Sequence, residues 1–348
     1  MTGSAHGVTS VSHQLLYLLY GDKTAYRLEA KFSILSALRH RKNPADFTIT
    51  LMTDQPEAFE GWPVTVLPMS AETLDAWQGA DGYSHRRKAC AIQAGVMLAG
   101  KTIFIDTDTV FFKDPALLFK RVTDDQFLMD EFELSWAQAS RRAWYRPLVT
   151  LLDAEFIAPA PALRLFNSGV CGMTNANGHI VEGAISLIDQ WAHLGARILT
   201  IEQIALSFML YGRRVVEAND CLNHYYAVKR YHHAMYRTFF HEQGEGYRDD
   251  LPEASFAVPD RLPRNPLRDR LRLKWKFMRQ GAVPRKAAKF YLLGKRANRC
   301  PYLETCKLLW WAVAVEELKR LEAADKSCKI LAELWQEDTE FLSFIKNN

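Results

Sequence analysis

Asp106 and Asp108 are the residues whose types and spacing most clearly indicate chemistry. They follow the largely apolar run Thr102–Ile105, and residues i and i+2 of an extended chain project to the same side. Two converging carboxylates repel each other unless a proton or a divalent cation lies between them, and their hard oxygen atoms suit Mg²⁺ or Mn²⁺. The pair therefore predicts a metal site that also receives phosphate oxygens. A turn cap beside a solvated Asp is the simpler alternative.

Alternating strand and helix patterns lead up to this pair and must position it. In chain order we expect a strand at Leu15–Tyr20, a helix at Tyr26–Leu38, strands at Phe47–Met52 and Val64–Leu67, a helix from Ser84 to Gly100, and a strand at Thr102–Ile105. This alternation is typical of a mainly parallel α/β sheet, which binds ligands outside the carboxyl ends of its strands. Tyr20, Asp54 and Asp106 all fall at such ends.

Further along the chain, Ala162–Met173 has a strand pattern interrupted at Asn167-Ser168-Gly169, and an amphipathic helix is expected over Ile180–Leu194. Residues 242–266 are rich in Gly, Pro and acids, which is typical of a linker or a long surface loop. We therefore expect a catalytic domain over residues 1–245. A linker and a basic, mainly helical region are expected over residues 246–348.

Five short motifs occur in an order that resembles a family of glycosyltransferases. They are Leu-Tyr-Gly-Asp-Lys-Thr-Ala-Tyr, Leu-Met-Thr-Asp, Ile-Phe-Ile-Asp-Thr-Asp-Thr-Val, Phe-Asn-Ser-Gly-Val and Glu-Gln-Ile-Ala-Leu. Over residues 14–240 the chain is similar to the GT-A fold family of bacterial lipopolysaccharide galactosyl- and glucosyltransferases and glycogenin. The resemblance implies transfer of a sugar, with a UDP-sugar favoured, to a glycan or lipid-linked glycan in surface polysaccharide synthesis.

The resemblance also implies which residues hold the nucleotide sugar. The loop after the first strand would receive the base and ribose, an acid after the second strand would contact them, and Arg87 or Lys88 would face the diphosphate or the sugar. The loop before the later strand would bind the sugar hydroxyls. The residues implied are Tyr20, Gly21, Tyr26, Asp54, Lys88, Asp106, Asn167 and Ser168.

Catalytic groups follow from the same resemblance. Either Asp130 or Glu131 matches an acid near the sugar, and we favour Asp130. Glu202 and Gln203 match an Asp-Gln pair beside the anomeric carbon, although this chain has Glu in place of Asp. An inverting reaction needs a carboxylate base, and a retaining one does not, so the stereochemistry stays open.

The resemblance implies a histidine as the third ligand of Mn²⁺ or Mg²⁺, beside Asp106 and Asp108. We select His233, which lies in Tyr231-His232-His233, while His224 and His241 lie nearby in the sequence. The family's fuller His-x-x-Gly-x-x-Lys-Pro pattern is missing from this chain.

Charge is distributed unevenly along the chain. Residues 261–300 hold 14 Lys or Arg and one acid, which leaves 30 basic and 39 acidic residues elsewhere. Leu267, Leu271, Trp275 and Met278 fit one face of a helix among these cations, which favours peripheral contact with an anionic membrane surface. The alternatives are a helix packed on the catalytic domain and a strand, because residues 271–277 also alternate.

Other classes of protein are less consistent with the sequence. Asp106-Thr107-Asp108-Thr109-Val110 also fits a haloacid dehalogenase phosphohydrolase with Asp106 as nucleophile, but such enzymes need a later acidic pair, and Asp249-Asp250 lies in a polar segment. The net negative charge outside residues 261–300 argues against a nucleic-acid partner. Six scattered cysteines (Cys90, Cys171, Cys221, Cys300, Cys306 and Cys328) and an N-terminus without a signal pattern favour the cytoplasm.

Overall fold

The computed structural model describes residues 11–155, 159–195, 197–323 and 329–348. The N-terminal segment and Cys328, on which part of the localisation argument depends, lie outside these ranges. The chain forms two compact units, one of residues 1–226 with 246–253 and one of residues 227–245 with 254–348. Each unit has its own hydrophobic core.

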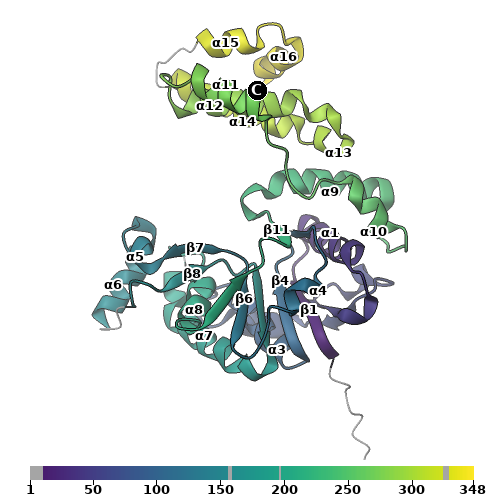
Figure 1. Ribbon diagram of the computed structural model, residues 1–348, viewed down its shortest axis with the longest axis vertical. Coiled ribbons are helices and arrows are strands. Elements are labelled where there is room, and N and C mark those ends of the chain that lie inside the picture. The colour runs from purple at the N-terminus through teal and green to yellow at the C-terminus, as the bar shows by residue number, and fades with distance from the viewer. Residues whose placement is uncertain (1–10, 156–158, 196, 324–328) are drawn as a thin grey trace, which may run out of the picture. The chain divides into compact units, whose positions relative to one another are not determined.

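The first unit is built on a seven-stranded mixed sheet in the order β10-β6-β9-β4-β1-β2-β3 (Figure 1). All neighbouring strands are parallel except β9, which is antiparallel to both β4 and β6. The strands are β1 (Val11–Leu19), β2 (Thr48–Thr53), β3 (Thr65–Pro68), β4 (Ala99–Ile105), β6 (Gln126–Met129), β9 (Val170–Thr174) and β10 (Arg214–Glu217). The expected α/β architecture with a mainly parallel sheet is confirmed.

Helices cover both faces of this sheet because its central strands are apolar on both sides. Leu16 and Phe104 belong to the core beneath α3 (Arg86–Val96), α7 (Gly178–Trp191) and α8 (Ile201–Met209). Tyr17 points to the other face, where its hydroxyl lies 3.1 Å from that of Ser33 on α1 (Thr24–His40).

Two small antiparallel sheets and several short helices complete the first unit. One sheet pairs β5 (Thr109–Phe111) with β11 (Leu222–His224), and the other pairs β7 (Phe132–Ser135) with β8 (Arg164–Phe166). The remaining helices are α2 (Ala71–Gln78), α4 (Ala116–Phe119), α5 (Trp136–Ala139), α6 (Arg146–Ala154) and α10 (Leu251–Ala254), whose last residue belongs to the second unit.

The second unit is helical in its described residues. Its helices are α9 (Lys229–Gln243), α11 (Leu267–Lys276), α12 (Ala282–Lys295), α13 (Pro301–Glu304), α14 (Lys307–Ala323), α15 (Lys329–Trp335) and α16 (Thr339–Asn347). Aromatic residues fill its core, where Tyr291, Trp311 and Phe341 lie in contact. The expected helix around Leu267–Met278 is confirmed, and the strand alternative for that segment is wrong.

The structure refines the sequence-based expectations in three places. The helix expected to stop at Gly100 ends at Val96, and Gly100 lies within β4, because the chain turns directly into the central strand. At the end of the region expected to be mainly helical, two helices form, α15 and α16, and the side chain of Asp338 caps α16. Residues 227–245 belong to the second unit, where α9 packs with α13, while residues 246–253 belong to the first.

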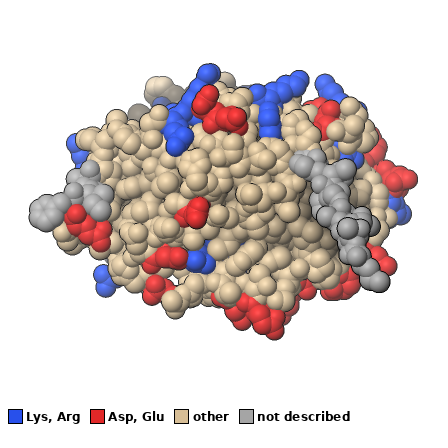
Figure 2. All heavy atoms as spheres, turned by 90° about the horizontal axis from the view of Figure 1, so that it is seen from below, with Lys and Arg blue, Asp and Glu red and all other residues tan. Residues whose placement is uncertain are grey.

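Figure 2 shows the first unit from the side on which the parallel strands begin. Few charged side chains interrupt the middle of that face, and most of them lie round its rim. Among the described residues, no helix combines the length and the apolar character that a membrane crossing requires.

Candidate metal centre

Most of the polar residues that the sequence singles out lie where the parallel strands of this sheet end. Asp106 follows β4 and Asp130 follows β6, while Asn167-Ser168-Gly169 precede β9. Because β9 runs antiparallel, its beginning lies beside the ends of β4 and β6. The backbone N–H of Asp106 donates to the carbonyl of Gly169 at 2.8 Å, and that of Asp130 donates to the carbonyl of Asn167 at 3.2 Å.

A distant strand brings His224 to the aspartate pair. His224 is the last residue of β11 and pairs with Thr109 of β5. Thr109 is the residue directly after Asp108. The next residue, Tyr225, donates its backbone N–H to the Asp108 carbonyl at 3.0 Å. Gly169 makes room for the imidazole, since a Cβ atom there would lie 2.2 Å from the ring of His224. The register of β11 on β5 and the lack of a side chain at Gly169 together fix the position of this histidine.

Asp106, Asp108 and His224 form a group whose three ligand atoms lie within 4.8 Å of one another. The imidazole Nε2 is 3.3 Å from Asp108 Oδ1 and 4.0 Å from Asp106 Oδ2. Two carboxylates and one imidazole are a suitable donor set for a divalent ion such as Mn²⁺, and the imidazole makes the set less suited to Mg²⁺. The residues present therefore fit the expected metal.

Asp130 holds the other side of the same imidazole. The Nδ1 atom of His224 lies 2.6 Å from Asp130 Oδ2, which is how carboxylates orient histidine ligands in metal sites. Burial opposes a charge on the ring, but hydrogen bonds to Asp108 and Asp130 outweigh it and raise the pKa of His224 to about 10. Without a metal the imidazolium bridges two carboxylates, and a bound metal would replace its Nε2 proton.

Lys88 supplies the cation beside Asp106. Its ammonium donates to Asp106 Oδ2 at 2.7 Å and to the Ser168 hydroxyl at 3.1 Å. Burial opposes the ammonium charge, yet the carboxylates of Asp106 and Glu202 raise the pKa of Lys88. Burial also raises the pKa of Asp106, although Lys88 acts against this. The carboxylate therefore depends on positive charge around it.

Glu202 lies behind this ion pair and is buried in a hydrogen-bond network. It accepts from the Tyr83 hydroxyl at 2.6 Å and from the Ser168 hydroxyl at 3.4 Å, and His85 Nδ1 lies 3.5 Å away. Burial would raise the pKa of Glu202, but the hydrogen bond with His85 and the charge of Lys88 lower it on balance. Sequence analysis missed Tyr83 and His85, although the spacing of His85 from Lys88, one helical turn, was an available signal.

Glu133 joins two predicted site residues that are far apart in the sequence. Its carboxylate accepts from the side-chain amide of Asn167 at 3.0 Å and from that of Gln203 at 3.0 Å. Asn167 also accepts from the N–H of Gly169 at 2.9 Å, so both ends of its amide are engaged. No local pattern around Glu133 distinguishes it, because β7 pairs only with β8 and the partners lie on other elements.

The residues predicted to bind the nucleotide lie after β1 and β2 at the same edge. Gly21 has a φ of +80° and donates its N–H to Asp54 Oδ2 at 2.9 Å, which links two of the predicted residues. The guanidinium of Arg87 lies 4.8 Å from the centre of the Tyr20 ring. Tyr26 is 36% exposed, and the ammonium of Lys23 lies 5.3 Å from its ring centre. Both rings are therefore accessible to charged neighbours and not enclosed in the core.

The histidine that the structure brings to the aspartate pair differs from the one selected from the sequence. The group that the structure brings together contains His224, whereas His233 lies on α9 of the second unit. The geometry favours His224 because β5 and β11 pair beside the aspartates. Between Arg87 and Lys88, it is Lys88 that contacts Asp106, while Arg87 donates to the carbonyl of Leu74 at 2.7 Å.

The fold and site together define an α/β protein with a mainly parallel sheet and an Asp-Asp-His group able to hold a divalent cation. No protein-family model matches this chain, and no curated protein matches it. Among solved structures it is similar to an apo structure of the bifunctional glycosyltransferase WbbM, with 13% identity and a TM-score of 0.40. That similarity covers 62% of this chain and 40% of that one. A match this distant leaves the function to be argued from the site.

Proposed function

We propose that the first unit is a metal-dependent glycosyltransferase of the GT-A type that uses a nucleotide diphosphate sugar. The Asp106, Asp108 and His224 group is the observation on which the proposal rests, because two hard carboxylates and an imidazole converge at the carboxyl edge of the sheet. The motifs that resemble the family, from Leu19 to Leu206, agree with this assignment.

The electrostatics of this edge support a diphosphate ligand. Among the described residues, Asp130, Glu131 and Glu133 add to the negative charge of the aspartate pair, so a phosphate group would be repelled unless a cation intervened. A bound divalent cation would bridge phosphate oxygens and neutralise the charge that develops on the leaving nucleoside diphosphate. Lys88 is the side-chain cation already at the pair, 2.7 Å from Asp106.

The network behind the metal group suggests how the donor sugar is held. Asn167 and Gln203 are fixed by Glu133, and Ser168 is fixed between Lys88 and Glu202. Such pre-oriented amides and hydroxyls bind sugar hydroxyls without reorganising. Asp130 holds His224 in this scheme, which makes it a positioning residue, and Glu202 and Gln203 stay the proposed groups beside the anomeric carbon.

The finer assignments extend the resemblance. We propose Mn²⁺ as the preferred ion, a UDP-sugar as donor, with Tyr20, Gly21, Tyr26 and Asp54 receiving its base and ribose, and a glycan or lipid-linked glycan as acceptor. The base and ribose would lie near the contact of Gly21 with Asp54, because that contact orders the loop after β1.

Calorimetric titration tests the donor site. Wild type and the variants Asp108→Asn, His224→Gln and Asp125→Asn are titrated with UDP, GDP and their sugars, each with and without Mn²⁺. Asp125 is exposed and lies outside the site, so Asp125→Asn is the matched control. We expect metal-dependent nucleotide binding that falls at least about 100-fold in Asp108→Asn and His224→Gln and is unchanged in the control. Equal binding in all four proteins would overturn the proposal.

A phosphohydrolase is the second function to exclude. Asp106 would then be phosphorylated by a simple phosphate ester, and no nucleotide would bind. The position of Asp249 and Asp250, which are exposed and precede α10, argues against that reaction because the required second acidic pair is not at the site. Phosphorylation of Asp106, detected by mass spectrometry, would replace the transferase assignment.

A further inference from the structure

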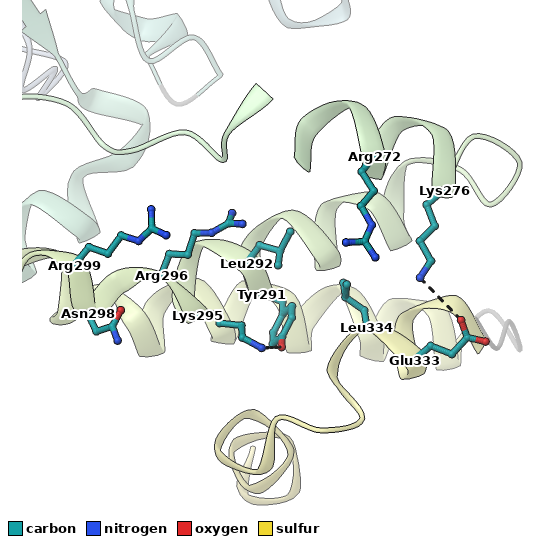
Figure 3. A pocket seen from close by; sticks show the side chains of 10 residues that line it. All are labelled: Arg272, Lys276, Tyr291, Leu292, Lys295, Arg296, Asn298, Arg299, Glu333 and Leu334. Carbon is teal, nitrogen blue, oxygen red and sulfur yellow. Dashed lines mark hydrogen bonds and ion pairs between the residues drawn. The ribbon is translucent and has the colours of Figure 1, made fainter. Parts of the chain in front are cut away.

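A basic cavity lies within the second unit, between α11, α12 and α15 (Figure 3). Its volume is about 490 Å³. Half of the ten residues that line it are Lys or Arg, and Glu333 is the one carboxylate among them. The five cations are Arg272, Lys276, Lys295, Arg296 and Arg299. Figure 3 shows that Arg272 and Lys276 reach down from α11 toward the side chains of α12 and α15.

Part of this positive charge has no protein counterpart. Arg296 is held by Asn265 and Asp269, and Lys295 lies 3.6 Å from Asp338. The side chains of Arg272 and Arg299 have no ion pair or hydrogen bond within the described part of the chain. Glu333 lies 3.9 Å from Lys276, and its side chain is 61% exposed, so this contact is weak. The cavity therefore holds an excess of cations that an anionic ligand would neutralise.

The chemistry of the lining selects a phosphate group. Arginine guanidinium groups bind phosphate oxygens through paired hydrogen bonds, and lysines add point charges. The cavity is larger than an inorganic phosphate ion and has the size of a small-molecule site. It therefore suits a phosphate that carries a substituent, such as a headgroup or a phosphorylated sugar.

An apolar stripe on the same helix indicates where that phosphate comes from. Leu267, Leu271, Trp275 and Met278 are 65%, 49%, 73% and 64% exposed. Leu267, Leu271 and Trp275 recur at helical spacing on α11, and Met278 lies in the turn that follows it. Leu271 and Trp275 each precede a cavity residue, Arg272 and Lys276. The opposite side of this segment is buried through Leu273 and Phe277. One helix thus offers an apolar stripe directly beside the cationic cavity, which is the pattern of interfacial membrane helices.

We propose that the second unit binds anionic phospholipid surfaces by seating a headgroup phosphate in this cavity while the stripe of α11 enters the interface. The stripe and the cavity complement the two parts of such a surface, its acyl region and its charged headgroups. This membrane site is separate from the donor site of the proposed transferase and does not depend on the metal.

Vesicle co-sedimentation of the full chain tests the proposal. Phosphatidylcholine vesicles with and without phosphatidylglycerol are compared for wild type, Arg272→Gln/Arg299→Gln and Arg268→Gln/Arg279→Gln. The second pair is the matched control, because it removes equal charge from exposed positions near α11 that do not line the cavity. We expect binding that requires phosphatidylglycerol and falls roughly 30-fold in the cavity variant, at about 5-fold per cation. The control should lose no more than about 5-fold, because its side chains do not line the cavity and would not contact a phosphate seated there.

Further measurements distinguish a lipid headgroup from a soluble phosphate compound, and a membrane from a nucleic acid. Trp275→Gln should weaken vesicle binding, and the cavity variant should still bind nucleotide with Mn²⁺ as wild type does if the donor site is as proposed. Equal losses in the cavity and control variants would mean diffuse charge attraction and overturn the proposal. Cavity-dependent binding of glycerol 3-phosphate without vesicle binding would overturn the lipid source. Tighter cavity-dependent binding of single-stranded RNA than of vesicles would replace the membrane with a nucleic acid.

Discussion

Two charged regions of this protein are organised in opposite ways. At the carboxyl edge of the first unit, acids and bases are interleaved and half-buried or buried, as in Lys88 with Asp106 and His224 with Asp108 and Asp130. In the cavity of the second unit, cations gather at the surface, and Arg272 and Arg299 lack partners among the described residues. Buried charges must be paired to be stable, whereas exposed ones tolerate a missing partner. The charges of the first region are therefore paired in advance, whereas the second region keeps cations that an anionic ligand could neutralise.

The largest loss of stability is expected when one lysine is removed from the first region. We expect Lys88→Met to lower the free energy of unfolding of the metal-free protein by about 3 kcal/mol, because Asp106 then lies beside Asp108 without its cation. Arg299→Met, in the cavity, should change it by no more than about 0.5 kcal/mol. Urea unfolding measures both. Similar losses in the two variants would mean that the two regions do not differ in this way.

The stability of the first region should depend on pH through His224. The pKa of His224 is raised to about 10 by Asp108 and Asp130 against the effect of burial, and its ordinary value is 6.5. Its contribution to stability is thus complete below about pH 6.5 and is lost as the pH rises toward 10. Metal-free protein should be less stable at high pH than near neutrality, and His224→Gln should flatten this dependence.

Added Mn²⁺ should act in the reverse direction, since the metal requires a neutral imidazole and binds more tightly as the pH rises. Thermal unfolding across this pH range, with a chelator and then with Mn²⁺, gives both trends. A pH dependence that His224→Gln leaves unchanged would show that the imidazolium is not the group responsible.

A methyl group added at Gly169 should give the smallest of the three effects. Its Cβ atom would lie 2.2 Å from the His224 ring, so we expect Gly169→Ala to destabilise the protein by about 2 kcal/mol and to weaken Mn²⁺ binding. Gly246→Ala is the matched control, because no atom lies within 4 Å of its added Cβ, and it should be neutral. Unchanged Mn²⁺ affinity in Gly169→Ala would argue against His224 as a ligand.

Local sequence patterns predicted the strands and helices better than they predicted which distant residues contact each other. The apolar runs before Asp54 and Asp106 predicted the strands, since buried parallel strands are apolar on both faces. The exposed stripe on α11 was readable from helical spacing alone. His233 was preferred to His224 because the sequence carries no information on which strand pairs with β5. The roles of Tyr83 and Glu133 were missed for the same reason, as their partners are distant in the chain.

Local sequence patterns were enough to predict the alternation of strands and helices, the acid pair at the end of a central strand, and the basic helix with its apolar stripe. These features depend on periodicities of two and 3.6 residues, which are local. Three features became apparent only in the fold: His224 lies beside Asp106 and Asp108, Asp130 faces this histidine, and α11, α12 and α15 line a cavity. Each of these depends on contacts between distant segments, which are fixed when the sheet and the helical core assemble.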